Sequence, residues 1–83
     1  MKKLIHFSAE WCMPCKNNQT IVEKFLQENP DIEYKKIDID KEPEVAKEYS
    51  VMGVPTYVSY WNGKMHDRKT GSATRFQLEQ LFG

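Results

Sequence analysis

The sequence predicts an α/β fold: a four-stranded mixed sheet of strand order 2-1-3-4, with helices on both faces and the element order β-α-β-α-β-β-α. Two observations support this prediction. Strand-like and helix-like apolar segments alternate in the first half of the chain, and a tight-turn signal separates two strand-like segments in the second half. With 83 residues, the chain is long enough for one domain, residues 1–83, and too short for two separate cores.

The first half of the chain is typical of a βαβ unit. Residues 2–8 are expected to form a central strand buried on both faces, with apolar side chains at Leu4, Ile5 and Phe7. A helix of about four turns should begin near Pro14 and end at Asn29-Pro30. Its apolar positions at helical spacing are Ile21, Val22, Phe25 and Leu26. Residues 32–38 then form a second strand, which a right-handed crossover makes parallel to the first.

A hairpin is predicted in the second half. Residues 57–61 and 64–69 flank Asn62-Gly63, and both turn residues tolerate positive φ. The two strands should therefore be antiparallel. In the order 2-1-3-4, strands 32–38 and 64–69 form the sheet edges, and both carry charged residues that oppose unwanted strand pairing.

Two further helices complete the predicted fold. A short helix is expected from about residue 43 to residue 49, with Val45, Ala46 and Tyr49 on its apolar face. The last helix should begin after Thr74, because Gln77 three residues later completes a capping box. Its buried stripe is expected to consist of Leu78, Leu81 and Phe82.

The composition narrows the functional classes. Twelve Lys and Arg balance twelve Asp and Glu, so no net charge favours binding to nucleic acid or to an anionic membrane. No stretch approaches transmembrane length, and the apolar run after Lys2-Lys3 is shorter than the hydrophobic region of a signal peptide. We therefore expect a cytoplasmic monomer in a compartment that keeps thiols reduced, where the two cysteines are not a permanent cross-link.

Cys12 and Cys15 are the strongest candidates for chemistry. At the start of a helix, unpaired backbone N–H groups and the helix dipole favour the thiolate, which is the attacking species in disulfide exchange. Pro14 fixes φ and lacks an N–H that the first turn does not need, which keeps the two sulfurs close enough to bond. Two other interpretations are inert buried thiols and a zinc site completed by His6 and His66, although the spacing fits no common zinc pattern.

The sequence also resembles the thioredoxin family. The family's active-site stretch is similar to residues 7–16, Phe-Ser-Ala-Glu-Trp-Cys-Met-Pro-Cys-Lys, and the stretch that faces it is similar to residues 53–56, Gly-Val-Pro-Thr. Residues 36–40 and Gly71 also match, so the similarity covers nearly the whole chain. The resemblance implies a thioredoxin-like fold and a protein-disulfide reductase that acts on disulfide-containing client proteins. It implies no metal and no bound cofactor, with electrons from a thioredoxin reductase and NADPH or from glutathione.

The resemblance assigns roles to individual residues. Cys12 would attack the client disulfide and Cys15 would resolve the mixed disulfide. Pro55 would be a cis proline, and the backbone of Val54 before it would pair with the extended client. The candidate catalytic residues are Cys12, Cys15, Pro14 and His6. The candidate substrate-binding residues are Trp11, Met13, Val54, Pro55 and Gly71.

Three features depart from the thioredoxin pattern. The sequence starts at the central strand, without the family's usual first strand and helix, and is close in size to a glutaredoxin. Met13 replaces a common glycine and should make the face beside Cys12 more apolar and adaptable. His6 replaces a buried acid, and either relays protons for Cys15 as a neutral imidazole or is packed with both nitrogens satisfied. Lys36 resembles a lysine near that acid, or only keeps an edge strand soluble.

Three other functions remain open from the sequence. Size favours a glutaredoxin-like enzyme recharged by glutathione, whereas Trp11 and residues 74–78 favour a thioredoxin. A second alternative is a binding or processivity subunit that uses the fold and in which the thiols are incidental. A third is a dedicated oxidant or isomerase, which would need a secretory context and a less stable disulfide.

Overall fold

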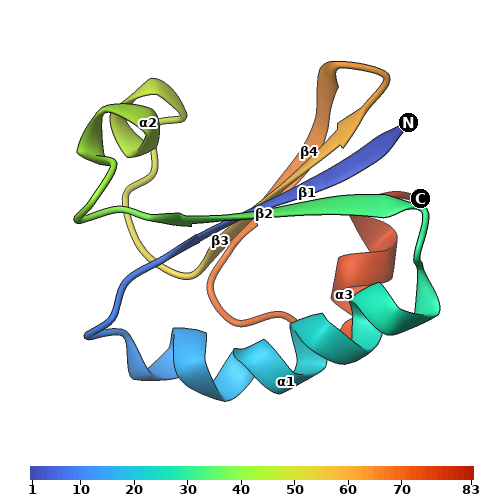
Figure 1. The fold of residues 1–83 in the computed structure, drawn as a ribbon, viewed down its shortest axis with the longest axis horizontal. Coiled ribbons are helices and arrows are strands. Elements are labelled where there is room, and N and C mark those ends of the chain that lie inside the picture. Colours follow the sequence, from blue (N-terminus) through green and yellow to red (C-terminus); the bar gives the residue numbers. More distant parts are fainter.

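The fold was analysed in a computed structural model that describes residues 1–83, and it has the predicted element order (Figure 1). The elements are β1 (Lys2–Ser8), α1 (Met13–Glu28), β2 (Ile32–Asp38), α2 (Pro43–Glu48), β3 (Thr56–Trp61), β4 (Lys64–Thr70) and α3 (Arg75–Gln80). The sheet order is β2-β1-β3-β4, with β1 parallel to β2 and antiparallel to β3, and with β3 antiparallel to β4. The predicted α/β class and the 2-1-3-4 order are confirmed.

Helices cover both faces of the sheet. Figure 1 shows α1 and α3 below the strands and α2 beyond the opposite face. Strand β1 contributes to both layers: Leu4 packs in the cluster with Val22 and Phe25 of α1, whereas Ile5 and Phe7 pack in the cluster that includes Ala46 of α2. Because both faces are covered, β1 is buried without interruption from Leu4 to Ser8, as predicted for a central strand.

Helix α1 differs from the sequence expectation in the face that it buries. Its buried residues are Cys15, Asn18, Val22 and Phe25. Ile21 was predicted on this face, but its side chain is 37% exposed. The prediction was wrong because the stripe that contains Cys15 continues at steps of three and four residues through position 18, and Ile21 lies beside this stripe.

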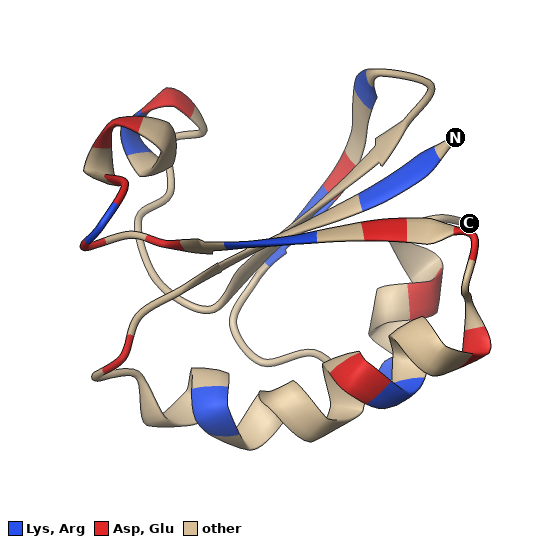
Figure 2. Cartoon of the chain, viewed as in Figure 1, with Lys and Arg blue, Asp and Glu red and all other residues tan.

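The hairpin forms at the predicted turn. Asn62 and Gly63 both have positive φ, at 54° and 81°, and Trp61 pairs with Lys64 across the turn. Strands β2 and β4 are the sheet edges, and Figure 2 shows that both carry charged residues of either sign. Acidic and basic residues also alternate over the helices, so neither sign dominates the chain.

Local chemistry also defines the last helix. The Thr74 side chain accepts from the Gln77 N–H, and the Gln77 side chain accepts from the Thr74 N–H, which completes the predicted capping box. Helix α3 ends at Gln80, and Leu81 and Phe82 beyond it are buried in the same cluster as Leu78. None of the three helices combines the length and hydrophobicity that a membrane crossing requires.

Candidate active site

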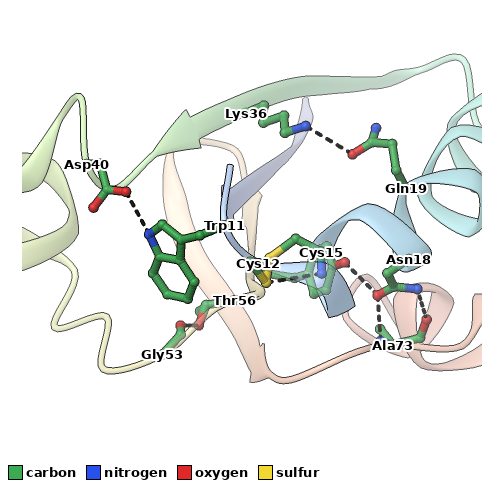
Figure 3. Close-up of a disulfide and its surroundings, with 11 residues drawn as sticks. Trp11, Cys12, Cys15, Asn18, Gln19, Lys36, Asp40, Gly53, Thr56 and Ala73 are labelled. Atoms are coloured by element: carbon green, nitrogen blue, oxygen red, sulfur yellow. Dashed lines mark hydrogen bonds between the residues drawn. A yellow bond between two sulfur atoms is a disulfide. The ribbon is translucent and has the colours of Figure 1, made fainter. Parts of the chain in front are cut away.

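Cys12 and Cys15 form a disulfide at the start of α1 (Figure 3). Cys12 is the N-cap residue with an extended backbone, and its Cα lies 5.3 Å from that of Cys15. Its Sγ accepts a hydrogen bond from the Cys15 N–H at 3.1 Å, in the same way that an oxygen would cap a helix. Pro14 occupies the first turn, where its missing N–H costs nothing. The local backbone therefore supplies a donor that favours negative charge on Cys12.

Burial does not distinguish the two sulfurs. Cys12 is 3% exposed and Cys15 is 2% exposed, and both pack in a small cluster with Ala9. The difference between them is their position. Cys12 lies between the exposed side chains of Trp11 and Met13, whereas Cys15 lies one turn into the helix on its buried face.

A rim of apolar side chains and backbone surrounds the disulfide. Trp11 and Met13 are exposed, and the half-buried Val54 packs against the cysteine cluster. The Val54-Pro55 peptide bond is cis. Gly71 has a φ of 99°, in the left-handed region that favours glycine, and its N–H donates to the Pro55 carbonyl at 2.7 Å. The five predicted substrate-binding residues therefore come from the loop before α1 and its first residue, and from the two loops before and after the β3-β4 hairpin.

Trp11 is held by a side-chain hydrogen bond that the sequence did not predict. Its indole Nε1–H donates to Asp40 Oδ2 at 2.7 Å, and Asp40 follows the carboxyl end of β2 (Figure 3). The bond links two surface residues that are 29 positions apart in the sequence. It fixes the N–H edge of the indole of Trp11, the residue before Cys12, while leaving 66% of the residue exposed.

We expect that Asp40→Ala weakens binding of a protein substrate, because the indole loses its anchor and samples more rotamers. One hydrogen bond to a charged acceptor at an exposed site corresponds to a rise in KM of up to about 10-fold. The measurement is the KM for a protein disulfide together with the fluorescence anisotropy of Trp11 in a Trp61→Phe background. Asp40→Asn is the matched control, since its amide oxygen still accepts from the indole. Unchanged KM and anisotropy in Asp40→Ala would contradict this role.

His6 is fully buried on β1, and only one of its nitrogens is hydrogen-bonded. Its ring stacks on Tyr57 with a centroid distance of 4.5 Å, and Nδ1 lies 2.9 Å from the Tyr34 hydroxyl. Nε2 is buried and has no hydrogen-bond partner. Burial, reinforced by the positive charge of Lys36, lowers the pKa of His6 to about 4, so the ring is neutral at neutral pH. The interpretation in which both nitrogens are satisfied is therefore wrong for Nε2, and no hydrogen bond joins His6 to either cysteine.

A hollow of about 690 Å³ lies behind the active site and reaches Cys15. Lys36 lines it and donates to Gln19 Oε1 at 3.3 Å in an exposed hydrogen bond. Lys16 and Asp38 also line the hollow. Cys15 itself is almost fully buried at the wall of this hollow.

Asn18 is a buried polar residue that the sequence analysis missed. Its Nδ2 donates to the Ala73 carbonyl at 2.8 Å, and its Oδ1 accepts from the Ala73 N–H at 2.8 Å and from the Tyr57 hydroxyl at 2.6 Å (Figure 3). An asparagine in a helix is ordinarily taken as a surface residue. The available signal was its spacing, three residues after Cys15 and four before Val22, on the face that must meet the sheet.

The zinc interpretation would require His6 and His66 to meet the cysteine pair. His66 lies on β4, exposed and edge-on to Trp61 at 5.8 Å, whereas His6 is buried on β1 beside Tyr57. No group of three or more His, Cys, Asp or Glu side chains is placed to hold a metal ion. The two cysteines are joined to each other instead.

Comparisons with known proteins agree with this geometry. The family model described as Thioredoxin matches residues 1–82. The thioredoxin of Mycoplasmoides gallisepticum is 34% identical over 80 residues, which cover 96% of this chain and 80% of the relative. The thioredoxin of Chlamydia trachomatis is 38% identical over 78 residues, covering 94% and 76% respectively. Among solved structures, oxidized mitochondrial thioredoxin 3 of Saccharomyces cerevisiae superposes with a TM-score of 0.89 at 37% identity, covering 95% of this chain and 74% of that one.

Proposed function

Since this chain belongs to the thioredoxin family and is a thiol-disulfide oxidoreductase, we propose that it reduces disulfides of client proteins with Cys12 as the attacking thiolate and Cys15 as the resolving thiol. The observation that carries this proposal is the Cys12-Cys15 disulfide at the start of α1, where the Cys15 N–H donates to Cys12 Sγ. A donor aimed at Cys12 stabilises its thiolate, and Cys15 lacks the equivalent N-cap position.

The proposed cycle transfers two electrons from the Cys12-Cys15 dithiol to the client disulfide. The Cys12 thiolate attacks one sulfur of the client disulfide, which forms a mixed disulfide and releases the other client sulfur as a thiolate that takes up a proton. Cys15 then loses its proton and attacks Cys12 Sγ, which releases the second client thiol. The client disulfide is reduced, the Cys12-Cys15 disulfide is formed, and an external reductant must restore the dithiol.

We propose that the client docks as an extended segment beside Pro55. Val54 lies outside the strands, and its backbone N–H and carbonyl make no backbone hydrogen bond within the chain, so both can pair with a client main chain. The exposed side chains of Trp11 and Met13 supply an apolar surface around the disulfide. Met52, which is 95% exposed, extends this surface on the Pro55 side.

We also propose that His6 relays the proton that Cys15 loses. Its buried, unpartnered Nε2 on the central strand supports this role. Because its pKa is about 4, holding the proton at pH 7 costs about 4 kcal/mol, so His6 would pass the proton on and not store it. The proposed final acceptor is solvent in the hollow that Cys15 and Lys36 line, and Lys36 is the residue of β2 that is paired with His6 of β1.

We propose that the electrons come from a thioredoxin reductase and NADPH. With a protein disulfide as substrate, we expect client reduction driven by the reductase to be at least about 10-fold faster than reduction driven by glutathione, because a dithiol pair exchanges efficiently with another dithiol enzyme. NADPH oxidation and client thiol release measure the two routes side by side. A faster rate with glutathione alone would instead support the glutaredoxin-like alternative.

The remaining proposals concern assembly and location. We propose a cytoplasmic monomer whose partners are client proteins and a reductase. The equal numbers of acidic and basic residues support protein partners over nucleic acid or membrane surfaces. Sedimentation of the purified chain and fractionation of cells that express it test these two points.

A further inference from the structure

Asn18 joins three parts of the fold through one side chain. It is only 4% exposed and lies three residues after Cys15 on the buried face of α1. Its amide pairs with both backbone groups of Ala73, which is itself 2% exposed. Tyr57 of β3 donates to the same Oδ1. The side chain therefore connects the helix of the active site to the sheet and to the loop that precedes α3.

The chemistry of this contact favours asparagine. A carboxamide offers one acceptor and one donor in a plane, which matches the N–H and carbonyl of a peptide unit. The second lone pair of Oδ1 receives the Tyr57 hydroxyl, whose pKa is raised by burial so that it keeps its proton. Three buried groups are satisfied by one amide, and removing it would leave the Ala73 N–H and carbonyl without partners.

The loop held by Asn18 is also hydrogen-bonded to Pro55, the residue after Val54, which packs against the cysteine cluster. Ala73 is two residues after Gly71, and the Gly71 N–H donates to the Pro55 carbonyl at 2.7 Å. Segment 71–73 is thus fixed at one end to the residue after Val54 and at the other end to the helix that carries Cys15. The start of α3 is stabilised independently, because the Thr74 capping box and the buried Leu78 do not depend on Asn18.

We propose that Asn18 is a positioning residue for client binding, which holds segment 71–73 against α1 and thereby sets the distance between the Gly71-Pro55 rim and the disulfide. This inference rests on the proposed docking of clients beside Pro55. Asn18 touches neither sulfur, so its effect is on the affinity for an extended protein substrate. The intrinsic reactivity of Cys12 stays the same.

The test compares Asn18→Leu with Asn17→Leu. Asn17 is the preceding residue, is exposed and makes no side-chain hydrogen bond, so it controls for loss of an asparagine on the same helix. For Asn18→Leu we expect the KM for a protein disulfide to rise about 10-fold with kcat within about 2-fold, since the three hydrogen bonds of the buried amide are lost outside the reacting atoms. The rate with a small aromatic disulfide and the reduction potential should stay unchanged.

A second readout follows the contact between Asn18 and segment 71–73 without using activity. Hydrogen exchange of the Ala73 amide, measured by NMR, should become at least about 10-fold faster in Asn18→Leu, because its acceptor is gone. Asn18→Asp is the variant of matched size. It keeps an acceptor for the Ala73 N–H and the Tyr57 hydroxyl but faces the Ala73 carbonyl with an oxygen, so it should raise KM while protecting the amide. It also supplies the KM test if Asn18→Leu does not fold.

Several results would overturn the inference. If KM stays unchanged while the Ala73 amide exchanges faster, the contact between Asn18 and segment 71–73 does not govern client binding. A rise in KM accompanied by comparable falls in kcat and in the rate with the small disulfide would show a general structural role. If the unmodified chain and Asn17→Leu both fail to reduce any protein disulfide, the proposed function falls, whereas Ala73 exchange still reports whether Asn18 holds the loop.

Discussion

Cys15→Ser should accumulate as a covalent complex with its client, and Cys12→Ser should form none. In Cys15→Ser the attack by Cys12 proceeds, because the backbone N–H of residue 15 still donates to Cys12 Sγ. The serine hydroxyl cannot displace the client sulfur, so the mixed disulfide persists until an external thiol attacks it. Multiple-turnover reduction should be lost in both variants. Non-reducing electrophoresis and intact-mass measurement after incubation with a disulfide-bonded protein detect the complex.

This experiment distinguishes the roles of the two cysteines, which do not differ in burial. Both cysteines are almost completely buried in the oxidised pair, and only the N-cap position of Cys12 separates them. A variant with both cysteines replaced by serine gives the background level of trapping. Equal trapping by Cys12→Ser and Cys15→Ser would refute the assignment of attacker and resolver. Full client reduction by the doubly substituted chain would refute disulfide exchange as the mechanism.

Replacing His6 with Phe should remove a large part of the acid sensitivity of the fold. The pKa of His6 is lowered to about 4 in the folded chain, from 6.5, mainly by burial. The unfolded chain therefore binds this proton more readily, and the stability that His6 contributes is complete above pH 6.5 and is lost as the pH falls toward 4. The free energy of unfolding should fall over this range by about 3 kcal/mol more in the unmodified chain than in His6→Phe.

Urea denaturation of the oxidised proteins at a series of pH values between 4 and 7 measures this difference. Carboxylates titrate in both proteins, so their contribution cancels when the two pH profiles are subtracted. The absolute stability of His6→Phe also changes, because Tyr34 loses its hydrogen-bond partner, but this loss does not depend on the titration of His6. Parallel profiles would mean that His6 does not titrate differently in the folded state.

The same variant tests the proposed proton relay. If His6 relays the proton from Cys15, the rate at which Cys15 resolves a preformed mixed disulfide should fall in His6→Phe, and its pH dependence should move to higher pH. Rapid mixing followed by acid quench gives this rate separately from the rate of attack by Cys12. An unchanged profile would leave His6 as a neutral core residue.

The sequence alone determined the helices and strands and the pair of reactive cysteines. Asn62-Gly63, the Thr74-Gln77 capping box and the apolar run of β1 each act within a few residues, so local patterns were enough to predict the hairpin, the start of α3 and the central strand. The order Cys-Met-Pro-Cys after a strand likewise predicted a thiol pair at the start of a helix, and residues 53–56 suggested what faces it.

Only the tertiary structure decided how the site is supported. Asn18 is buried where it meets Ala73, which lies 55 residues away in sequence, whereas Ile21 beside the buried stripe of α1 is 37% exposed. The bond between Trp11 and Asp40, like the single hydrogen bond of His6, also depends on strands that come together only in the assembled sheet. Residue types and their spacing in the sequence indicate which side chains prefer water and which prefer the interior. Whether a buried amide or imidazole finds a partner depends on groups brought close by folding, which no local pattern encodes.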